Sequence, residues 1–201
     1  MTSCSVGIYP ETKHPTYHDS VGLSLEEPLV KALRANGLDR RDAAVFVQSF
    51  EVSNLQELNR ELKVNIVQLT SASGRPYDFT VKNDPRTYAD LTTPTGLRWV
   101  ARYADGLGPD KNQIVPRDAQ NRLLAPTSLV QDAHRAGLQV HPYTFRPENS
   151  FLPADFRQGN SESTRGNQPA ELKLFYKLGV DGVFADNPDT AVAVRRKVFG
   201  R

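Results

Sequence analysis

The chain has 201 residues, of which 38% are hydrophobic and 24% are charged, and its formal charge is +2 at pH 7. This length suits one domain with a sizeable core, but it is short for a complete eight-unit barrel of roughly 250 residues. The near-neutral charge and the dispersed basic residues argue against a nucleic-acid partner, and no apolar run reaches the about 18 residues that a membrane span needs.

Short apolar stretches alternate with helical stretches along the chain. Ser24, Ser53 and Thr93 are typical residues for the start of a helix, and Gly37 and Gly137 are typical of a helix end. In chain order, strands are predicted at 6–11, 45–50, 64–69, 105–108, 138–145 and 182–186, and helices at 24–36, 53–62, 93–104, 127–136, 169–178 and 188–199.

This regular return of helix and buried strand predicts an α/β fold with parallel strands joined by crossover helices. Polar residues follow many successive strands, whereas an open doubly wound sheet gathers them at one crevice, so a barrel is favoured over the open sheet. We therefore expect residues 1–201 to form part of a single TIM barrel domain with about six of the eight strand and helix units.

Two connections are too long for simple turns. Residues 70–92 and 149–167 each follow a predicted strand, so they are expected to lie over the carboxyl ends of the strands. Loops of this length are usually lids, binding loops or disordered segments, and the part from Gly159 to Asn167 is expected to be mobile.

The first predicted strand ends in a carboxylate and an ammonium group two positions apart. Glu11 and Lys13 should share one side, because alternate residues of a strand point the same way. A carboxylate suits a hard cation such as Ca²⁺ or Mg²⁺, and several basic side chains at one mouth suit a phosphate, so the pattern indicates metal-assisted chemistry on an anionic ester. The other candidate residues at strand ends are Lys111, Tyr143, Arg146 and Phe184.

Each of these residues also has a purely structural interpretation. Glu11 could form an ion pair with Lys13, Lys111 and Arg146 could be solvated or capping residues, and Tyr143 and Phe184 could pack in the core or at its rim. Of the four histidines, only His14 lies beside the candidate site in sequence, and its side chain is expected on the side opposite to Lys13. The sequence therefore offers no clear acid and base pair.

Five segments in the same order resemble successive strand motifs of the glycerophosphodiester phosphodiesterases, in particular the subgroup of bacterial periplasmic enzymes and their plant relatives. The resemblance covers nearly the whole chain. The segments are VGIYPETKHP at 6–15, VQSFE at 47–51, YADGLGP at 103–109, HPYTFR at 141–146 and GVDGVFADNPD at 179–189.

The resemblance implies a TIM barrel of the phosphatidylinositol-phospholipase-like type, a divalent Ca²⁺ or Mg²⁺ ion, and hydrolysis of glycerophosphodiesters to glycerol 3-phosphate and an alcohol. It implies that Glu11 is a metal-binding carboxylate and that Lys13 faces the phosphate. Lys111, Tyr143, Arg146 and Phe184 match pocket positions. Members of the family use two histidines as general acid and base. Family tendency is periplasmic or secreted, but this chain has no signal peptide that would fix its compartment.

The chain departs from the family pattern at its start. It has no strand ending in His-Arg-Gly, no Glu-x-Asp pair and no strand ending in His-Asp, so no matching catalytic histidine is present. We therefore expect the chain to be a carboxyl-terminal portion that is inactive or nearly inactive alone. Two alternatives remain. One is a non-catalytic remnant, either kept as a phosphate-ester binding or interaction module or simply a truncated gene, and the other is half of a split enzyme whose missing amino-terminal half supplies the histidines and two carboxylates.

Overall fold

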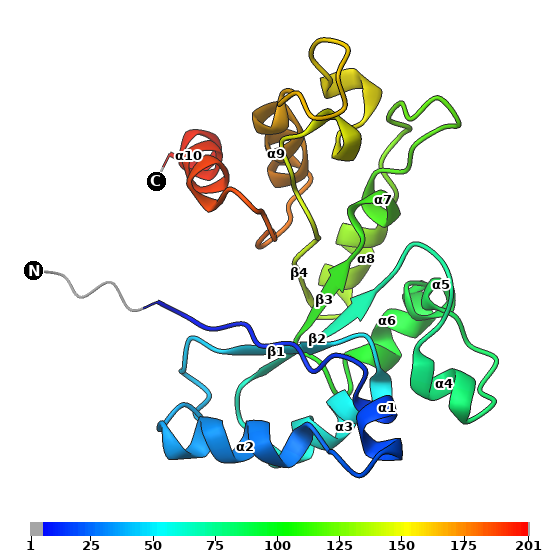
Figure 1. The fold of residues 1–201 in the computed structure, drawn as a ribbon, viewed down its shortest axis with the longest axis vertical. Coiled ribbons are helices and arrows are strands. Elements are labelled where there is room, and N and C mark those ends of the chain that lie inside the picture. The colour runs from blue at the N-terminus through cyan, green and yellow to red at the C-terminus, as the bar shows by residue number, and fades with distance from the viewer. Residues whose placement is uncertain (1–5, 201) are drawn as a thin grey trace, which may run out of the picture.

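The computed structural model describes residues 6–200, and its centre is a four-stranded parallel sheet (Figure 1). The strands follow one another in chain order, with β1 at Phe46–Ser49, β2 at Asn65–Thr70, β3 at Gly106–Pro109 and β4 at Gln139–Val140. All the pairings are parallel. The α/β class and the parallel sheet predicted from the sequence are confirmed, although β4 is much shorter than predicted.

The predicted strand at 6–11 is not a continuous strand, and the reason is a proline. The Ile8 and Thr12 amides donate to the carbonyls of Ala44 and Gln48, which is parallel pairing beside β1. Pro10 lies between them and has no N–H to donate, so the ladder is reduced to two isolated bridges. Residues 8–12 therefore lie along β1 without forming a regular strand.

The predicted strand at 182–186 is likewise replaced by a single bridge, between Phe145 and Ala185. The segment still pairs with the end of the preceding one, since the Phe145 amide donates to the Phe184 carbonyl at 2.8 Å. Pro109 at the end of β3 and Pro142 just after β4 have no N–H group to donate, so the regular pairing on both sides of β4 stops at these residues. Prolines thus shorten the regular sheet at both of its edges.

The six predicted helices are present, with ends shifted by a few residues, and shorter ones occur within the connections. In the first long connection, residues 77–81 and 88–91 are helical, so this segment is not a plain loop. The helices are α1 Pro15–Ser20, α2 Glu26–Ala35, α3 Val52–Glu61, α4 Tyr77–Val81, α5 Tyr88–Leu91, α6 Pro94–Val100, α7 Lys111–Ile114, α8 Leu129–Arg135, α9 Gln168–Lys177 and α10 Pro188–Phe199, with 3₁₀ turns η1 Asn149–Phe151 and η2 Ala154–Phe156.

The second long connection is built around a buried asparagine. The Asn149 side-chain amide donates to the carbonyls of Gln158 and Ser161 at 2.7 and 2.8 Å, and its Oδ1 accepts a hydrogen bond from the Gln158 amide. Gly166 fits only because it lacks a side chain, since an added Cβ would come within 2.7 Å of Asn149 Oδ1. The segment from Gly159 onward therefore makes specific contacts, and its mobility stays a prediction.

Helices cover the sheet and share one hydrophobic core with it. Helix α3 packs on β1 and β2, α8 packs on β4, and α10 packs on α9, so that α2 and α3 lie at one end of the molecule and α9 and α10 at the other (Figure 1). Leu55, Leu97 and Leu172 are fully buried in this core. Among the described residues, no helix combines the length and apolar character needed to cross a membrane.

The sheet curves enough to bring its first and last segments into contact. The Tyr9 ring stacks on Phe46 with centroids 5.0 Å apart and meets the Phe184 ring edge to face at 4.8 Å. Its hydroxyl lies 2.9 Å from Nδ1 of the buried His141. Side chains from residues 9 and 184 thus close the concave side of the sheet.

Candidate active site

The segment with Glu11 and Lys13 is fixed to the sheet by the residue between them. Thr12 is buried, its amide donates to the Gln48 carbonyl at 3.0 Å, and its hydroxyl donates to Asn54 Oδ1 at 2.6 Å. Consecutive side chains of an extended segment point to opposite sides. Anchoring Thr12 against α3 therefore turns Glu11 and Lys13 together toward the carboxyl ends of the strands.

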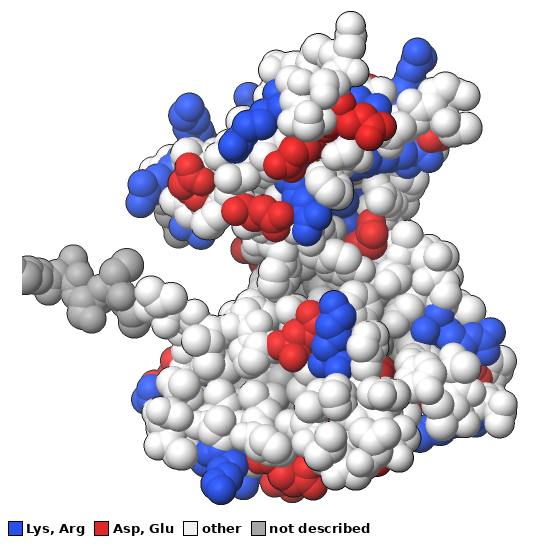
Figure 2. All heavy atoms as spheres, viewed as in Figure 1, with Lys and Arg blue, Asp and Glu red and all other residues white. Residues whose placement is uncertain are grey.

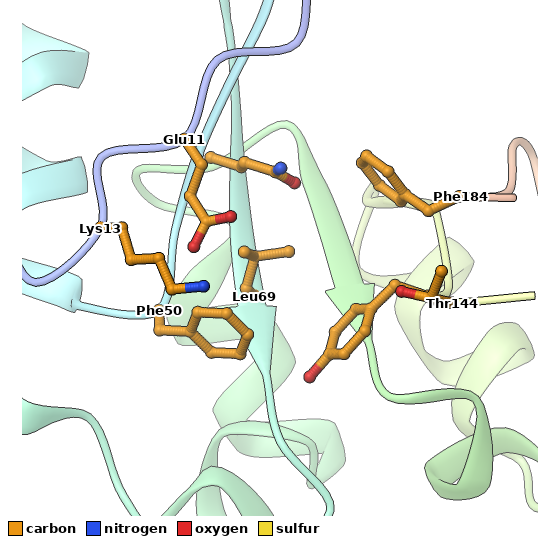
Figure 3. A pocket seen from close by; sticks show the side chains of 8 residues that line it. Glu11, Lys13, Phe50, Leu69, Thr144 and Phe184 are labelled. Atoms are coloured by element: carbon orange, nitrogen blue, oxygen red, sulfur yellow. The ribbon is translucent and has the colours of Figure 1, made fainter. Parts of the chain in front are cut away.

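Both side chains point into one cavity of about 250 Å³, which we call the central pocket (Figure 3). Glu11 and Lys13 come from one wall, and Thr144 and Phe184 lie across from them. Neither Glu11 nor Lys13 has an ion-pair partner within 4 Å among residues 6–200, so both charges are free to meet a ligand. The lining residues are Glu11, Lys13, Gln48, Phe50, Leu69, Tyr143, Thr144 and Phe184.

Gln48 supplies a neutral polar group to the central pocket. This residue of β1 is 7% exposed, and its Oε1 atom is buried without a hydrogen-bond partner in the structure. A buried acceptor that stays unpaired costs free energy, which a ligand hydroxyl could recover by donating to it. The pocket therefore combines one carboxylate, one ammonium group and one free amide oxygen.

Tyr143 and Phe184, both predicted from the sequence, form walls of this pocket. The Tyr143 hydroxyl donates to the Thr70 carbonyl at 3.0 Å, and its ring meets Phe50 edge to face at 5.9 Å. Burial raises the pKa of Tyr143 to about 12, so the phenol is neutral at ordinary pH and is not a general base. Phe184 is held by its contact with Tyr9.

Lys111 and Arg146 do not line the central pocket, in which Lys13 is the basic group of the lining, and their role in substrate binding stays a prediction. Lys111 is 6% exposed, and its Nζ lies 2.8 Å from Glu171 Oε1. Arg146 Nε lies 2.8 Å from Asp186 Oδ2, and its guanidinium covers the Phe151 ring at 4.6 Å. The head groups of Lys111 and Arg146 are therefore held by these carboxylates and this ring.

Lys111 and Arg146 instead line a second cavity of about 330 Å³, which we call the flanking cavity. It shares Tyr143 and Thr144 with the central pocket, so the two spaces adjoin. Its lining residues are Asp110, Lys111, Asn112, Arg117, Tyr143, Thr144, Arg146, Ser150 and Phe151.

A third cavity adjoins the central pocket on the other side, through Lys13 and Phe50, and His14 and Glu51 also line it. His14 has a left-handed backbone conformation with φ of 60°, which is uncommon for a residue other than glycine. Glu51 is 2% exposed, and burial raises the pKa of its carboxyl group. Its Oε1 has no hydrogen-bond partner.

The other histidines lie outside the three cavities. His141 packs against Tyr9 below the central pocket, and burial lowers its pKa. His18 is part of helix α1 and not of a strand end, and His134 Nε2 lies 2.9 Å from Asp181 Oδ2 on the surface. Within the described part of the chain, no histidine lines the central pocket.

The residues at hand do not by themselves form a site for Ca²⁺ or Mg²⁺. Glu11 is the single carboxylate that lines the central pocket, whereas these cations take about six oxygen ligands. Across residues 6–200, no three His, Cys, Asp or Glu side chains gather closely enough to hold a metal ion. Glu11 can therefore be at most one ligand of a larger set.

Sequence reasoning left several pocket residues out of the candidate site. Thr144 lies inside the HPYTFR segment and could have been found by its position between Tyr143 and Phe145. Arg117 and Glu171 are 54 residues apart, in a connection and in a helix, and no local pattern marks them. Only the tertiary structure brings the Arg117 guanidinium of the flanking cavity within 3.3 Å of Glu171, which lies behind it on α9.

Three comparisons with known proteins bear on this site. The model of the glycerophosphoryl diester phosphodiesterase family matches residues 1–190. Glycerophosphodiester phosphodiesterase GDPD6 of Arabidopsis thaliana is 34% identical over 90% of the chain and 49% of its own length, and the glycerophosphodiester phosphodiesterase of Haemophilus influenzae is 31% identical over 95% and 53%. The chain thus spans about half the length of the curated relatives it matches.

Solved structures show the same fold at low sequence identity. A protein of Silicibacter pomeroyi, provisionally identified as a glycerophosphoryl diester phosphodiesterase, superposes with a TM-score of 0.59 at 15% identity, over 94% of this chain and 49% of that one. A glycerophosphodiester phosphodiesterase from Parabacteroides distasonis superposes with a TM-score of 0.55 at 14% identity, over 96% and 59%. The α/β architecture is therefore TIM-barrel-like.

Proposed function

The chain belongs to the glycerophosphoryl diester phosphodiesterase family, and from this premise we propose that it carries the phosphate-binding part of a site that hydrolyses glycerophosphodiesters to glycerol 3-phosphate and an alcohol. The observation that carries this proposal is the pair of free charges in the central pocket. Lys13 points into the same space as Glu11 and has no ion-pair partner among the described residues, so its ammonium group can pair with a phosphoryl oxygen.

The neighbouring groups suit a diester with a glycerol arm. The unpaired Oε1 of Gln48 can accept a hydrogen bond from a glycerol hydroxyl, and the rings of Phe50 and Phe184 can pack against the carbon backbone of the glycerol. Tyr143 completes the wall as a neutral phenol. We propose that Lys13 binds the phosphate and that Gln48 binds a hydroxyl group of the same substrate.

The family resemblance implies a Ca²⁺ or Mg²⁺ ion and two histidines, which this pocket does not supply by itself. Glu11 is our candidate for one metal ligand, and the remaining ligands and the proton-transferring histidines would come from outside the residues of the central pocket. A bound divalent cation would stabilise negative charge on the phosphoryl group. In this proposal, the chain binds phosphate esters and has little or no turnover alone.

We extend the proposal to the architecture. The four strands and the paired segments 8–12 and 182–186 would represent six strand and helix units of a phosphatidylinositol-phospholipase-like barrel. The contact between Tyr9 and Phe184 supports it, because only a strongly curved sheet brings its two edges together.

The phosphate assignment is tested by the affinity of the 201-residue chain for glycerol 3-phosphate, measured by isothermal titration calorimetry. Lys13→Gln should weaken binding by roughly tenfold to a hundredfold, because a charge-assisted hydrogen bond contributes about 1.5 to 3 kcal/mol. The matched control is Lys63→Gln, since Lys63 is exposed just before β2. Equal affinities of the wild type and the Lys13 variant would contradict the assignment.

A second candidate function is phosphate-ester binding without hydrolysis, and the lone carboxylate of the central pocket favours it. The chain is assayed with a glycerophosphodiester and Ca²⁺ or Mg²⁺, and again with a chelator. Turnover that the chelator abolishes, however slow, would support hydrolysis over binding alone. Turnover that persists in Glu11→Ala would contradict the metal role of Glu11. Turnover gained by mixing with a polypeptide that bears the His-Arg-Gly segment would instead support half of a split enzyme.

A further inference from the structure

The flanking cavity adjoins the central pocket at Tyr143 and Thr144. Its volume of about 330 Å³ falls within the range of small-molecule sites. Tyr143 and Thr144 line both spaces, so a ligand whose phosphate meets Lys13 can enter the flanking cavity past these two residues.

We propose that the flanking cavity holds the alcohol arm of the diester and selects hydroxylated alcohols without positive charge, such as inositol or glycerol, over quaternary ammonium alcohols such as choline. This inference rests on the proposed function of the central pocket. Arg117, Arg146 and Asn112 then determine which alcohol arm the cavity accepts.

The basic groups of the cavity are held in place by partners behind them. Lys111 Nζ and Arg117 Nη2 lie 2.8 and 3.3 Å from the same Glu171 oxygen, and both donate to the Phe151 carbonyl at 3.2 Å. Glu171 is 1% exposed. Because these contacts already fix the head groups, a ligand meets a preorganised set of donors.

The charges of this region balance, which argues against a second phosphate as the ligand. Lys111, Arg117 and Arg146 supply three positive charges. Three carboxylates oppose them, since Glu171 pairs with the first two, Asp186 pairs with Arg146, and Asp110 lines the cavity itself. The balance favours a neutral polar group.

The ring that could bind an ammonium ligand in this cavity is already covered by a cation. Quaternary ammonium groups are usually bound over the face of an aromatic ring. Of the aromatic residues in the lining, Tyr143 is shared with the central pocket and Phe151 belongs to the flanking cavity alone. The guanidinium of Arg146 lies over the Phe151 ring at 4.6 Å. A choline group would have to displace Arg146 and would remain close to Lys111 and Arg117.

Two unpaired polar atoms complete the argument for a hydroxylated ligand. Arg117 Nε, a donor, and Asn112 Oδ1, an acceptor, are buried and have no hydrogen-bond partner in the structure. A hydroxyl group can donate one hydrogen bond and accept another, so a polyol can satisfy both atoms. Thr144 and Ser150 add two further hydroxyls to the lining.

The test compares the affinities of the 201-residue chain for glycerophosphoinositol and glycerophosphocholine, by calorimetry. The wild type should bind the inositol ester roughly tenfold more tightly, which corresponds to one or two hydrogen bonds. Arg146→Gln should uncover the Phe151 ring and bind the choline ester more tightly than the wild type does. This gain of affinity cannot result from misfolding.

Asn112→Ala should weaken binding of the inositol ester several-fold and leave glycerol 3-phosphate binding unchanged. The matched control for Arg146→Gln is Arg98→Gln, because Arg98 is exposed on α6 and lines none of the three cavities. Equal wild-type affinities for the two esters, or a ratio unchanged by Arg146→Gln, would overturn the inference. If either result is found while glycerol 3-phosphate binding still depends on Lys13, only the inference about the flanking cavity fails. If glycerol 3-phosphate binds independently of Lys13, or does not bind at all, the proposed function of the central pocket fails as well.

Discussion

Glu51 is a buried acidic residue that lines the third cavity together with Lys13. Its Oε2 accepts a hydrogen bond from the Thr16 amide at 3.2 Å, while its Oε1 is buried without a partner. Burial raises the pKa of this carboxyl group, and the nearby Asp78 acts in the same direction. The charged form is thus disfavoured in the folded protein.

Glu51→Gln is therefore expected to stabilise the protein at neutral pH. A carboxyl group whose pKa is higher in the folded state stabilises the fold at low pH, and this contribution is lost as the pH rises from its ordinary value through the raised one. At pH 7 the variant should gain about 1 kcal/mol in the free energy of unfolding, because a buried unpaired charge is removed.

The measurement is urea denaturation at pH 4 and pH 7. At pH 4 the two proteins should differ little, since Glu51 is then largely protonated. Glu162→Gln is the control, because Glu162 is an exposed loop residue. A variant that is less stable than the wild type at pH 7 would show that the Glu51 carboxylate has a favourable partner.

At the scale of elements, the connection 149–167 shows how one side chain can organise a loop without regular structure. Asn149 is 3% exposed and makes three hydrogen bonds to the backbone of Gln158 and Ser161. The Ser150 amide also donates to the Glu162 carbonyl. Because Ser150 and Phe151 line the flanking cavity, this order extends to the proposed alcohol site.

Asn149→Ala should release this connection and leave the sheet intact. Three lost hydrogen bonds, each contributing about 1 kcal/mol, predict a destabilisation on the order of 2 to 3 kcal/mol. Hydrogen exchange followed by mass spectrometry should show faster exchange at residues 149–166 and unchanged exchange in β1 and β2. The control is Asn36→Ala, since Asn36 is exposed after α2 and donates only to Ala32 within its own turn. Uniformly faster exchange would contradict a local role.

At the scale of the whole molecule, the two edges of the sheet are linked by Tyr9. Its ring contacts Phe46 on one side and Phe184 on the other, and its hydroxyl pairs with His141. Tyr9 and Phe184 are 175 positions apart in the sequence. Tyr9 therefore couples the Glu11 segment to the wall of the pocket across from it.

Tyr9→Ala should separate these edges and cost about 3 to 5 kcal/mol, as expected for loss of a large aromatic side chain. Tyr9→Phe should cost about 1 kcal/mol, because only the hydrogen bond to His141 is lost. Chemical denaturation measures both, and amide exchange at Phe145 should increase in the alanine variant, since that amide bonds to the Phe184 carbonyl. Tyr17→Ala, an exposed aromatic change on α1, should leave both unchanged.

The sequence by itself determined the local features of this protein. Alternating apolar segments and glycine stops predicted the six main helices and the parallel sheet, because these signals act within a few residues. Of the predicted starting residues, Thr93 caps its helix through its side chain, whereas the helices that begin near Ser24 and Ser53 have no side-chain cap. The sequence also determined that Glu11 and Lys13 share one side, which needs only an extended backbone. The family resemblance followed from short segments of the same kind.

The tertiary structure alone decided which groups meet. Lys111 and Arg117 share Glu171 across 60 and 54 residues, and this contact holds the Lys111 ammonium group outside the central pocket. Prolines at 10, 109 and 142 interrupt the hydrogen bonding between strands only because the position of the missing N–H group of each faces a neighbouring strand. Such pairings depend on how helices pack on the curved sheet, and the periodicity of a single segment carries no information about its distant partner.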